Sequence, residues 1–297
     1  MIKIKNLFKA FDDRPVLTNI NCTIKDCSVY GLVGVNGVGK STLLRIMSGV
    51  FSQDKGELLY DTSPVSDETV MQEIVFVPDD LYFFSGYTLL ETAKFYQALY
   101  KKFDLDEVVR LAGSFKLELN VSISKFSKGM KRQAAIICAL ATNAKYVFLD
   151  ETFDGLDPLV KKKMKSLISK KIIDNKSTVV LTSHSLRELE DICDHLIVMS
   201  EGSILFESEV DSLKTNMLKI QISLKKDFDR DDFKMLNIVT FKKSGSVATI
   251  IARDKNQKAF NDLKKLKPLL LESVPLSLEE VFIYEMEALG YEFDEII

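Results

Sequence analysis

The phosphate-binding pattern GxxxxGK[ST] occurs once in this chain, as Gly34-Val35-Asn36-Gly37-Val38-Gly39-Lys40-Ser41. Its glycines let the backbone turn inward, so that successive amides point at phosphate oxygens. We expect Lys40 to reach the β- and γ-phosphates and the Ser41 hydroxyl to ligate Mg²⁺. A helix expected over residues 40–48 aims its positive end at the same phosphates. The pattern therefore predicts a protein that binds a nucleoside triphosphate, or one that descends from such a protein.

Short apolar runs lie around this loop. Residues 2–4 and 20–24 alternate apolar and polar side chains, which predicts antiparallel strands with one buried face. Four further runs are mostly apolar, at residues 28–33, 74–77, 146–149 and 178–181. Because helical patterns separate them, they favour parallel strands buried on both faces. Residues from about 79 to 145 have helical patterns without a clear strand, so we expect a helical insertion into an α/β core.

The pattern changes after about residue 213. Residues 218–224 alternate again, and Ser244-Gly245 lies between two apolar runs, which indicates a hairpin. Ser277-Leu278-Glu279-Glu280 is a capping box that begins a further helix. We therefore predict a core domain over residues 1–213 and a small α+β accessory domain over residues 214–297.

Composition restricts the class of protein. Forty basic and 43 acidic residues among 297 leave a formal net charge of -3, which argues against nucleic-acid binding through bulk charge. No apolar run approaches the roughly 18 residues of a membrane span, and no signal peptide is expected. The four cysteines form no CxxC pair, so we interpret them as reduced core thiols of a cytosolic protein. With two histidines, a histidine-rich metal site is excluded.

Two carboxylates follow the apolar run at residues 146–149. A buried parallel strand delivers its carboxyl end to the ligand crevice of an α/β sheet. Asp150 is therefore predicted to hold Mg²⁺, directly or through water, and Glu151 to polarise the water that attacks the γ-phosphate. His184 follows the run at residues 178–181, where it is predicted to donate a hydrogen bond to the γ-phosphate.

Together these residues resemble the ATP-binding cassette (ABC) ATPases over residues 1 to about 213. Phe126-Ser127-Lys128-Gly129-Met130-Lys131-Arg132-Gln133 is similar to the family's LSGGQ signature, with Phe126, Lys128 and Met130 in place of Leu, Gly and Gln. The resemblance implies a phosphate-loop NTPase core with an antiparallel β subdomain. It also implies that residues 127–130, Ser127 and Gly129 above all, contact the ATP of a partner across a dimer interface.

The resemblance assigns roles to further positions. It implies that ATP contacts the whole phosphate loop and the residue after it, namely Gly34, Val35, Asn36, Gly37, Val38, Gly39, Lys40, Ser41 and Thr42. Phe11 resembles the aromatic residue that stacks on adenine. Asp157, in Asp154-Gly155-Leu156-Asp157, resembles the key acid of the D-loop, expected at the dimer seam. Thr182-Ser183-His184 resembles the region of the switch histidine.

One position departs from the family pattern. Asp79 stands where the family has the glutamine of the Q-loop, which senses Mg²⁺ and the attacking water. An acid at this place, usually glutamate, is typical of cassettes that serve the ABC-2 type of exporter. The following Leu81-Tyr82-Phe83-Phe84-Ser85-Gly86-Tyr87 is rich in aromatic residues. It is either part of the core or a groove for a helix of a membrane subunit.

The resemblance implies the ATPase subunit of a two-component ABC exporter. ATP and Mg²⁺ would close a head-to-tail homodimer, or a heterodimer with a related cassette. The substrate path would belong to a separate integral membrane permease, which would hold this chain on the cytoplasmic face of the membrane. The resemblance to exporter cassettes implies a peptide or an antibiotic as the substrate. Two alternatives are a soluble ABC protein that acts on ribosomes or DNA, and an unrelated phosphate-loop kinase. No nucleic acid is expected as a partner.

Overall fold

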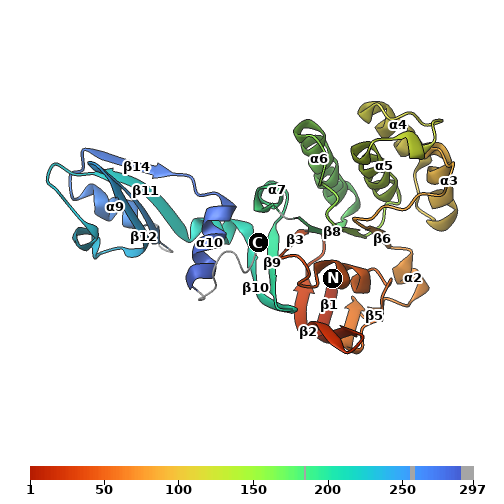
Figure 1. The fold of residues 1–297 in the computed structure, drawn as a ribbon, viewed down its shortest axis with the longest axis horizontal. Coiled ribbons are helices and arrows are strands. Elements are labelled where there is room, and N and C mark those ends of the chain that lie inside the picture. The colour runs from red at the N-terminus through yellow and green to blue at the C-terminus, as the bar shows by residue number, and fades with distance from the viewer. Residues whose placement is uncertain (184, 255–257, 289–297) are drawn as a thin grey trace. The chain divides into compact units, whose positions relative to one another are not determined.

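The computed structural model describes residues 1–183, 185–254 and 258–288 of the chain. The chain divides into two compact units, Met1–Glu207 and a second unit that begins at Ser208 (Figure 1). The boundary predicted from the sequence lies after residue 213, inside helix α8 (Val210–Thr215), which belongs to the second unit. Within the described residues, none of the helices has both the length and the apolar character needed to cross a membrane.

A six-stranded sheet in the order β10-β9-β3-β8-β7-β6 forms the centre of the first unit. Its strands are β3 (Val29–Val33), β6 (Ile74–Val77), β7 (Tyr146–Leu149), β8 (Thr178–Thr182), β9 (His195–Ser200) and β10 (Ser203–Glu209). β3 pairs in parallel with β8 and β9, and β7 pairs in parallel with β6 and β8. All residues of β3, β7, β8 and β9 are buried, which explains why these strands are apolar without alternation.

A second sheet, in the order β2-β1-β4-β5, is antiparallel. It contains β1 (Ile2–Phe11), β2 (Arg14–Ile24), β4 (Lys55–Tyr60) and β5 (Ser63–Pro64). Ile2, Ile4 and Ile20 lie on its buried face, in one hydrophobic core with Leu43 and Leu44 of helix α1 (Lys40–Met47). Because apolar and polar side chains alternate along β1 and β2, the apolar face of this sheet packs against the phosphate-loop helix α1.

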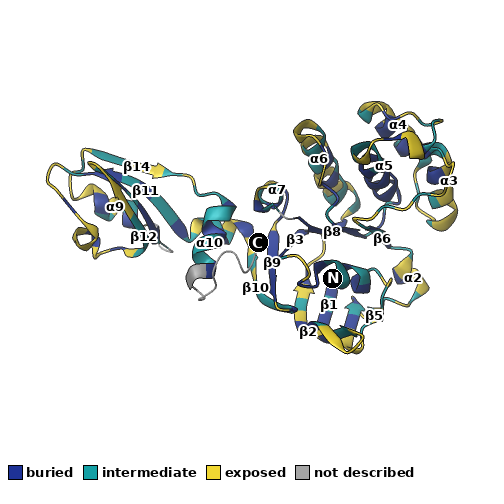
Figure 2. Cartoon of the chain, viewed as in Figure 1, coloured by how far each residue is buried: buried dark blue, intermediate teal, exposed yellow. Residues whose placement is uncertain are grey.

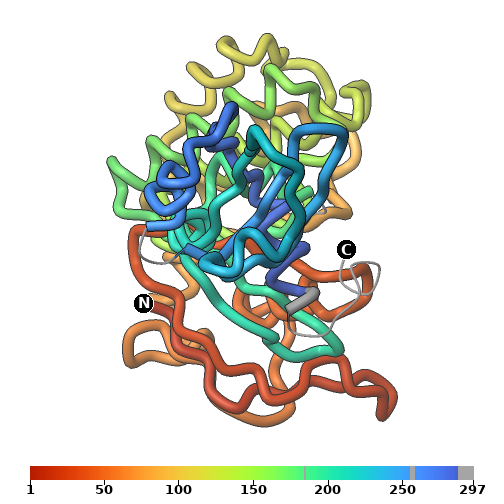
Figure 3. The backbone as a smooth tube through the Cα atoms, turned by 90° about the vertical axis from the view of Figure 1, so that its left-hand side faces the viewer, coloured from red at the N-terminus to blue at the C-terminus, as the bar shows by residue number. Residues whose placement is uncertain are grey.

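Helices make up most of the segment between β6 and β7. They are α3 (Leu89–Leu99), α4 (Leu105–Phe115), the short 3₁₀ helix η1 (Ile123–Lys125) and α5 (Lys128–Ala141). The other helices of this unit are α2 (Glu68–Met71), α6 (Pro158–Asn175) and α7 (Leu186–Glu190). Figures 1 and 3 place α3–α5 and the antiparallel sheet at opposite ends of the unit. α5 is buried from Arg132 to Ala141, and residues 134–141 of this stretch are all apolar (Figure 2).

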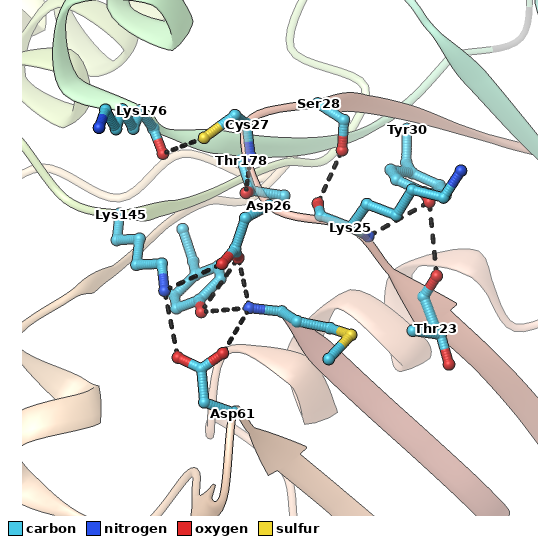
Figure 4. A network of polar contacts seen from close by, with 12 residues as sticks. Thr23, Lys25, Asp26, Cys27, Ser28, Tyr30, Asp61, Lys145, Lys176 and Thr178 are labelled. Carbon is cyan, nitrogen blue, oxygen red and sulfur yellow. Dashed lines mark hydrogen bonds and ion pairs between the residues drawn. The ribbon is translucent and has the colours of Figure 1, made fainter.

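Polar contacts join the two sheets of the first unit (Figure 4). The Lys145 ammonium group lies 3.3 Å from a carboxylate oxygen of Asp26 and 3.2 Å from one of Asp61. The amide of Cys27 donates a hydrogen bond of 3.0 Å to the Thr178 hydroxyl. Asp26 and Asp61 follow strands of the antiparallel sheet, whereas Lys145 and Thr178 lie at the amino ends of β7 and β8. These contacts therefore hold the amino ends of the parallel strands in place. The phosphate loop lies at the other edge of the sheet, where the carboxyl ends are.

The second unit contains an antiparallel sheet in the order β12-β13-β11-β14, together with short helices. Its elements are α8, β11 (Met217–Ser223), η2 (Arg230–Phe233), β12 (Asn237–Ser244), β13 (Val247–Arg253), α9 (Ala259–Lys264), β14 (Leu270–Val274) and α10 (Leu278–Ala288). The predicted hairpin at Ser244-Gly245 joins β12 to β13. Ser277 and Glu280 exchange amide-to-side-chain hydrogen bonds of 3.1 and 3.2 Å, as expected for the capping box of α10.

The four cysteines are free thiols. Cys138 and Cys193 are buried and Cys22 is half-buried, but Cys27 is exposed. The prediction of a core position is therefore wrong for Cys27, because it lies in the turn between β2 and β3 with a positive φ of 56° rather than on a buried strand. Burial raises the pKa of the Cys138 thiol to about 12, which makes this group unreactive.

Candidate functional site

The phosphate loop connects the carboxyl end of β3 to the first residue of α1, as the motif requires. Gly39 precedes the helix with a φ of 107°, a left-handed conformation that favours glycine. A Cβ atom at this position would lie 2.6 Å from a Leu17 side-chain carbon and 3.0 Å from the Val16 carbonyl oxygen. The antiparallel sheet therefore packs so closely against the loop that only glycine fits here.

Lys40 lies inside this loop. Its side chain is almost entirely buried, and its ammonium group donates to the carbonyl oxygens of Gly34 at 2.6 Å and Val35 at 3.0 Å. Burial lowers the pKa of Lys40, while the charges of Glu151 and Asp150 act in the opposite direction. These two carbonyls thus hold the ammonium group inside the loop, and a stronger acceptor could replace them. Asn36 and Gly37, at the tip of the loop, are exposed.

The carboxyl ends of three parallel strands meet beside this loop. Val77 of β6 lies opposite Leu149 of β7, which lies opposite Leu181 of β8. This register brings together the residues that follow each strand or end it, namely Asp79, Asp150 and Thr182. These three residues therefore lie at one edge of the sheet.

Asp150 connects this edge to the phosphate loop. Its side chain is buried, and Oδ1 accepts hydrogen bonds from the hydroxyls of Ser41 at 3.0 Å and Thr182 at 2.8 Å. Oδ2 is also buried, and no described residue donates a hydrogen bond to it. A buried carboxylate oxygen without a donor, beside a serine hydroxyl, fits the oxygen ligands that Mg²⁺ prefers. Among the described residues no group of three or more His, Cys, Asp or Glu side chains could hold a metal ion.

Glu151 has a left-handed backbone with a φ of 49°. Its amide donates a hydrogen bond of 2.8 Å to the Thr182 hydroxyl, and its carbonyl oxygen accepts one from the Arg132 guanidinium group. Such a conformation is unfavourable for a non-glycine residue and persists where the surroundings hold it in place. Two side chains from other elements therefore hold the peptide groups on both sides of the predicted base.

Asp79 does not stand alone at the Q-loop position. Its Oδ1 lies 2.5 Å from a guanidinium nitrogen of Arg132, and the Asp79 side chain is 47% exposed whereas that of Arg132 is 2% exposed. The sequence places Arg132 in the segment similar to the signature and Thr182 in the region of the switch histidine, but sequence reasoning assigned a role to neither. The signal for Arg132 is its charge just before residues 134–141 of α5, which are all apolar. Thr182 carries no comparable signal, because a threonine is common at the end of a strand.

The signature residues begin α5. The Ser127 hydroxyl accepts a hydrogen bond of 3.2 Å from the Met130 amide, so Ser127 is the N-cap, and both Ser127 and Lys128 are exposed. A Cβ atom on Gly129 would lie 3.2 Å from the Gly155 carbonyl oxygen. The start of the signature helix therefore packs tightly against the segment that contains the predicted D-loop.

The remaining predicted residues lie in different surroundings. Asp157 caps helix α6, accepting hydrogen bonds from the amides of Leu159 at 3.1 Å and Val160 at 3.0 Å. Phe11, at the end of β1, is 40% exposed and lies edge-on to Phe51 with 5.5 Å between ring centroids. His184 lies outside the described residues.

The aromatic segment after Asp79 is at the surface. Tyr82 is 81% exposed, and Phe84 and Tyr87 are also exposed. Phe84 lies 5.8 Å from Tyr82, 5.1 Å from Tyr87 and 5.1 Å from Phe95 of α3, between ring centroids. These four rings, Tyr82, Phe84, Tyr87 and Phe95, form what we call the aromatic patch. The interpretation of this segment as core is therefore wrong for its exposed rings.

Comparison with known proteins agrees with this geometry. A family model described as "ABC transporter" matches residues 17–154. The ABC transporter ATP-binding protein YtrB of Bacillus subtilis is 28% identical over 287 residues, covering 95% of this chain and 97% of the relative. The bacitracin transport ATP-binding protein BcrA of Bacillus licheniformis is 30% identical, covering 72% of this chain and 71% of the relative.

A solved structure shares the fold. It is described as the dimeric, post-hydrolysis state of the ATP-binding cassette MJ0796 bound to ADP and phosphate. The likeness has a TM-score of 0.64 at 23% identity and covers 70% of this chain and 98% of that one. It confirms the predicted α/β fold with a phosphate-loop NTPase core. The chain therefore belongs to the ABC transporter ATP-binding proteins, and it is an ATPase that forms the ATP-binding subunit of such a transporter.

Proposed function

We propose that this chain drives a two-component exporter, in which a separate integral membrane permease carries the substrate path. The observation that carries this proposal is the aromatic patch. Exposed rings gathered at one place on a surface are typical of an interaction site. Tyr82 of the patch lies three residues after Asp79, so a partner bound there would lie close to the segment that contains Asp79. This position suits a permease that senses the state of the nucleotide.

We assign antibiotics or peptides as the class of substrate. Support comes from the relatives, which include a bacitracin transport ATP-binding protein and the lantibiotic transport ATP-binding protein SrtF of Streptococcus pyogenes, 29% identical over 215 residues. On this proposal the chain lies on the inner face of the cell membrane, attached through its permease. On the same proposal, the unit from Ser208 onward would be an accessory domain.

Two copies of the cassette, identical or related, are proposed to close head to tail around ATP. The phosphate loop of one copy would hold the nucleotide, and the exposed Ser127, with Lys128, Gly129 and Met130, would reach the γ-phosphate from the other copy. An exposed serine hydroxyl at the start of a helix, where backbone amides point outward, fits an anion. Asp157 and the exposed residues around it would lie along the seam between the copies.

Within each site, different residues of this chain would bind the nucleotide, hold the metal ion and take part in hydrolysis. The loop amides and Lys40 would bind the β- and γ-phosphates, with Thr42 beside them and Phe11 stacked on the adenine. Ser41 and Asp150 would hold Mg²⁺, which supplies charge neutralisation on the phosphates. Glu151 would accept a proton from the attacking water as that oxygen bonds to the γ-phosphorus and the bond to the β-phosphate oxygen breaks. His184 would donate a hydrogen bond to the γ-phosphate.

Capture of the permease tests the proposal. The chain would be purified from detergent-solubilised membranes together with the polytopic protein encoded beside its gene. Replacing two rings of the aromatic patch, Tyr82→Ala with Phe84→Ala, should reduce recovery of that protein at least about tenfold, because such exposed aromatic residues dominate interfaces. Ile173→Ala, at a residue of α6 that is 78% exposed, is the matched control. Equal recovery with the double variant and the wild type would contradict the assignment of this surface.

A further inference from the structure

Arg132 occupies an unusual position for a charged side chain. It lies on α5, five residues after the exposed cap Ser127, yet its side chain is only 2% exposed. A buried guanidinium group is stable when acceptors occupy its donors and a negative charge lies beside it. The structure supplies both, from two segments that are distant in the sequence.

The first acceptor is the backbone carbonyl oxygen of Glu151. Glu151 has a left-handed backbone, and its amide is bound on the other side by the Thr182 hydroxyl at 2.8 Å. The direction of the Glu151 side chain depends on these two peptide groups, since φ and ψ at Glu151 set where its Cβ points. Whatever holds the Arg132 guanidinium group in place therefore also holds the predicted base.

The second acceptor is Asp79, whose Oδ1 lies 2.5 Å from the other terminal nitrogen of Arg132. The planar guanidinium group has donors in a rigid fork, so binding Asp79 with one nitrogen restricts where the other can point. Asp79 lies at the start of the segment that contains the aromatic patch, and its side chain is 47% exposed. Arg132 thus connects a solvent-accessible residue of that segment to the backbone of Glu151.

We propose that Arg132 is a positioning residue for ATP hydrolysis, which keeps Glu151 in its left-handed conformation and is itself oriented by Asp79. The proposal rests on the proposed role of Glu151 as the base. Displacement of Asp79 frees the guanidinium group to rotate and loosens its hold on the Glu151 carbonyl. A change in the segment of the aromatic patch therefore alters the catalytic step without a change in the groups that bind ATP.

Four variants test this inference in the full-length chain. Arg132→Gln should lower kcat about 10- to 100-fold, because a small displacement of a base is costly. Asp79→Asn should lower kcat about 3- to 10-fold, since Arg132 keeps its bond to Glu151 but loses its charge partner. Asp79→Glu, which keeps the carboxylate, should retain most of the wild-type kcat. The Asp79→Asn and Arg132→Gln double variant should be no slower than Arg132→Gln alone, because both act through one contact.

The readouts separate positioning from binding and from folding. The dissociation constant for ATP, measured by calorimetry, should change less than about threefold in every variant, because the phosphate loop is untouched. Glu118→Gln, at an exposed acid of the helical segment, controls for the loss of a surface charge and should keep the wild-type kcat. Thermal unfolding of each variant identifies any that fails to fold. If Arg132→Gln does not fold, the comparison of Asp79→Asn with Asp79→Glu decides alone.

Two outcomes overturn the inference. One is a wild-type kcat in Asp79→Asn or in folded Arg132→Gln. The other is a double variant whose loss equals the product of the two single losses, which would mean that the residues act independently. Glu151→Gln, measured alongside, separates this inference from the proposed function. If Glu151→Gln hydrolyses ATP normally, the role of the base fails. If Glu151→Gln is inactive while Arg132→Gln is normal, only the positioning role fails.

Discussion

The two sides of the nucleotide site differ in how their polar groups are satisfied. On the phosphate-loop side the groups are buried and bind one another: the Lys40 ammonium donates to loop carbonyls, and Asp150 accepts from Ser41 and Thr182. On the signature side, Ser127 is exposed and its hydroxyl caps its own helix. A single chain can thus assemble a phosphate cradle from its own parts, whereas the signature presents its polar groups to solvent. This difference is expected if a second copy completes the site.

Removing the predicted base should have the largest effect on the phosphate-loop side. Glu151→Gln keeps the volume of the side chain but cannot accept a proton, so kcat should fall at least about a hundredfold. ATP binding should persist, and an ATP-bound dimer should accumulate. Phosphate release and sedimentation with ATP and Mg²⁺ measure both effects. Undiminished turnover would remove Glu151 from its role, and a hydrolysis-dead variant that stays monomeric with its permease present would contradict the head-to-tail dimer.

Removal of the loop cation should affect binding. Lys40→Met keeps the aliphatic stem but loses the ammonium group, so the affinity for ATP should fall about 10- to 100-fold, as expected for a charge-assisted hydrogen bond in a buried site. Calorimetric titration with ATP and Mg²⁺ measures the change. Lys125→Met, at an exposed lysine just before the signature, is the control and should bind ATP normally. Wild-type affinity in Lys40→Met would show that this lysine does not contact phosphate.

The signature side should respond differently. Ser127→Ala should weaken ATP-dependent dimer formation about tenfold, the effect of losing one hydrogen bond to a charged group. ATP binding to the monomer should not change. The variant also loses a helix cap, which costs about 1 kcal/mol of unfolding free energy. Ser122→Ala removes a comparable cap from η1 and controls for that loss. An unchanged dimer constant, measured by sedimentation, would make the signature assignment wrong.

The smallest effect is expected at the adenine end. Phe11 is exposed and in contact with Phe51, so a base stacked on it would gain roughly 1 kcal/mol. Phe11→Ala should therefore weaken ATP binding about fivefold, and Phe11→Tyr should restore it. Inorganic triphosphate, which has no base to stack, should bind both variants as it binds the wild type. A loss of triphosphate binding in Phe11→Ala would indicate a disturbed loop instead of lost stacking.

Elements whose signals are local were predicted well from the sequence. The strands at residues 74–77 and 146–149 have the predicted bounds, because buried parallel strands need continuous apolar residues. The capping box at Ser277 forms because its partners are three residues apart. The sequence did not decide whether the rings of the aromatic patch are buried or exposed, since bulky rings occur both in cores and at interaction sites. Its exposure depends on what packs over the segment.

The sequence by itself determined the phosphate loop and the two acids at the end of β7, because each lies within one short stretch whose chemistry depends on neighbouring residues. Only the tertiary structure showed that Arg132 joins Asp79 to the Glu151 carbonyl, across separations of 53 and 19 residues. No local pattern encodes such a contact, because it forms only when β6, α5 and β7 are packed side by side. The partners of a buried charge are therefore a property of the packing, while the position of Arg132 just before the apolar residues 134–141 already indicates that this charge needs partners.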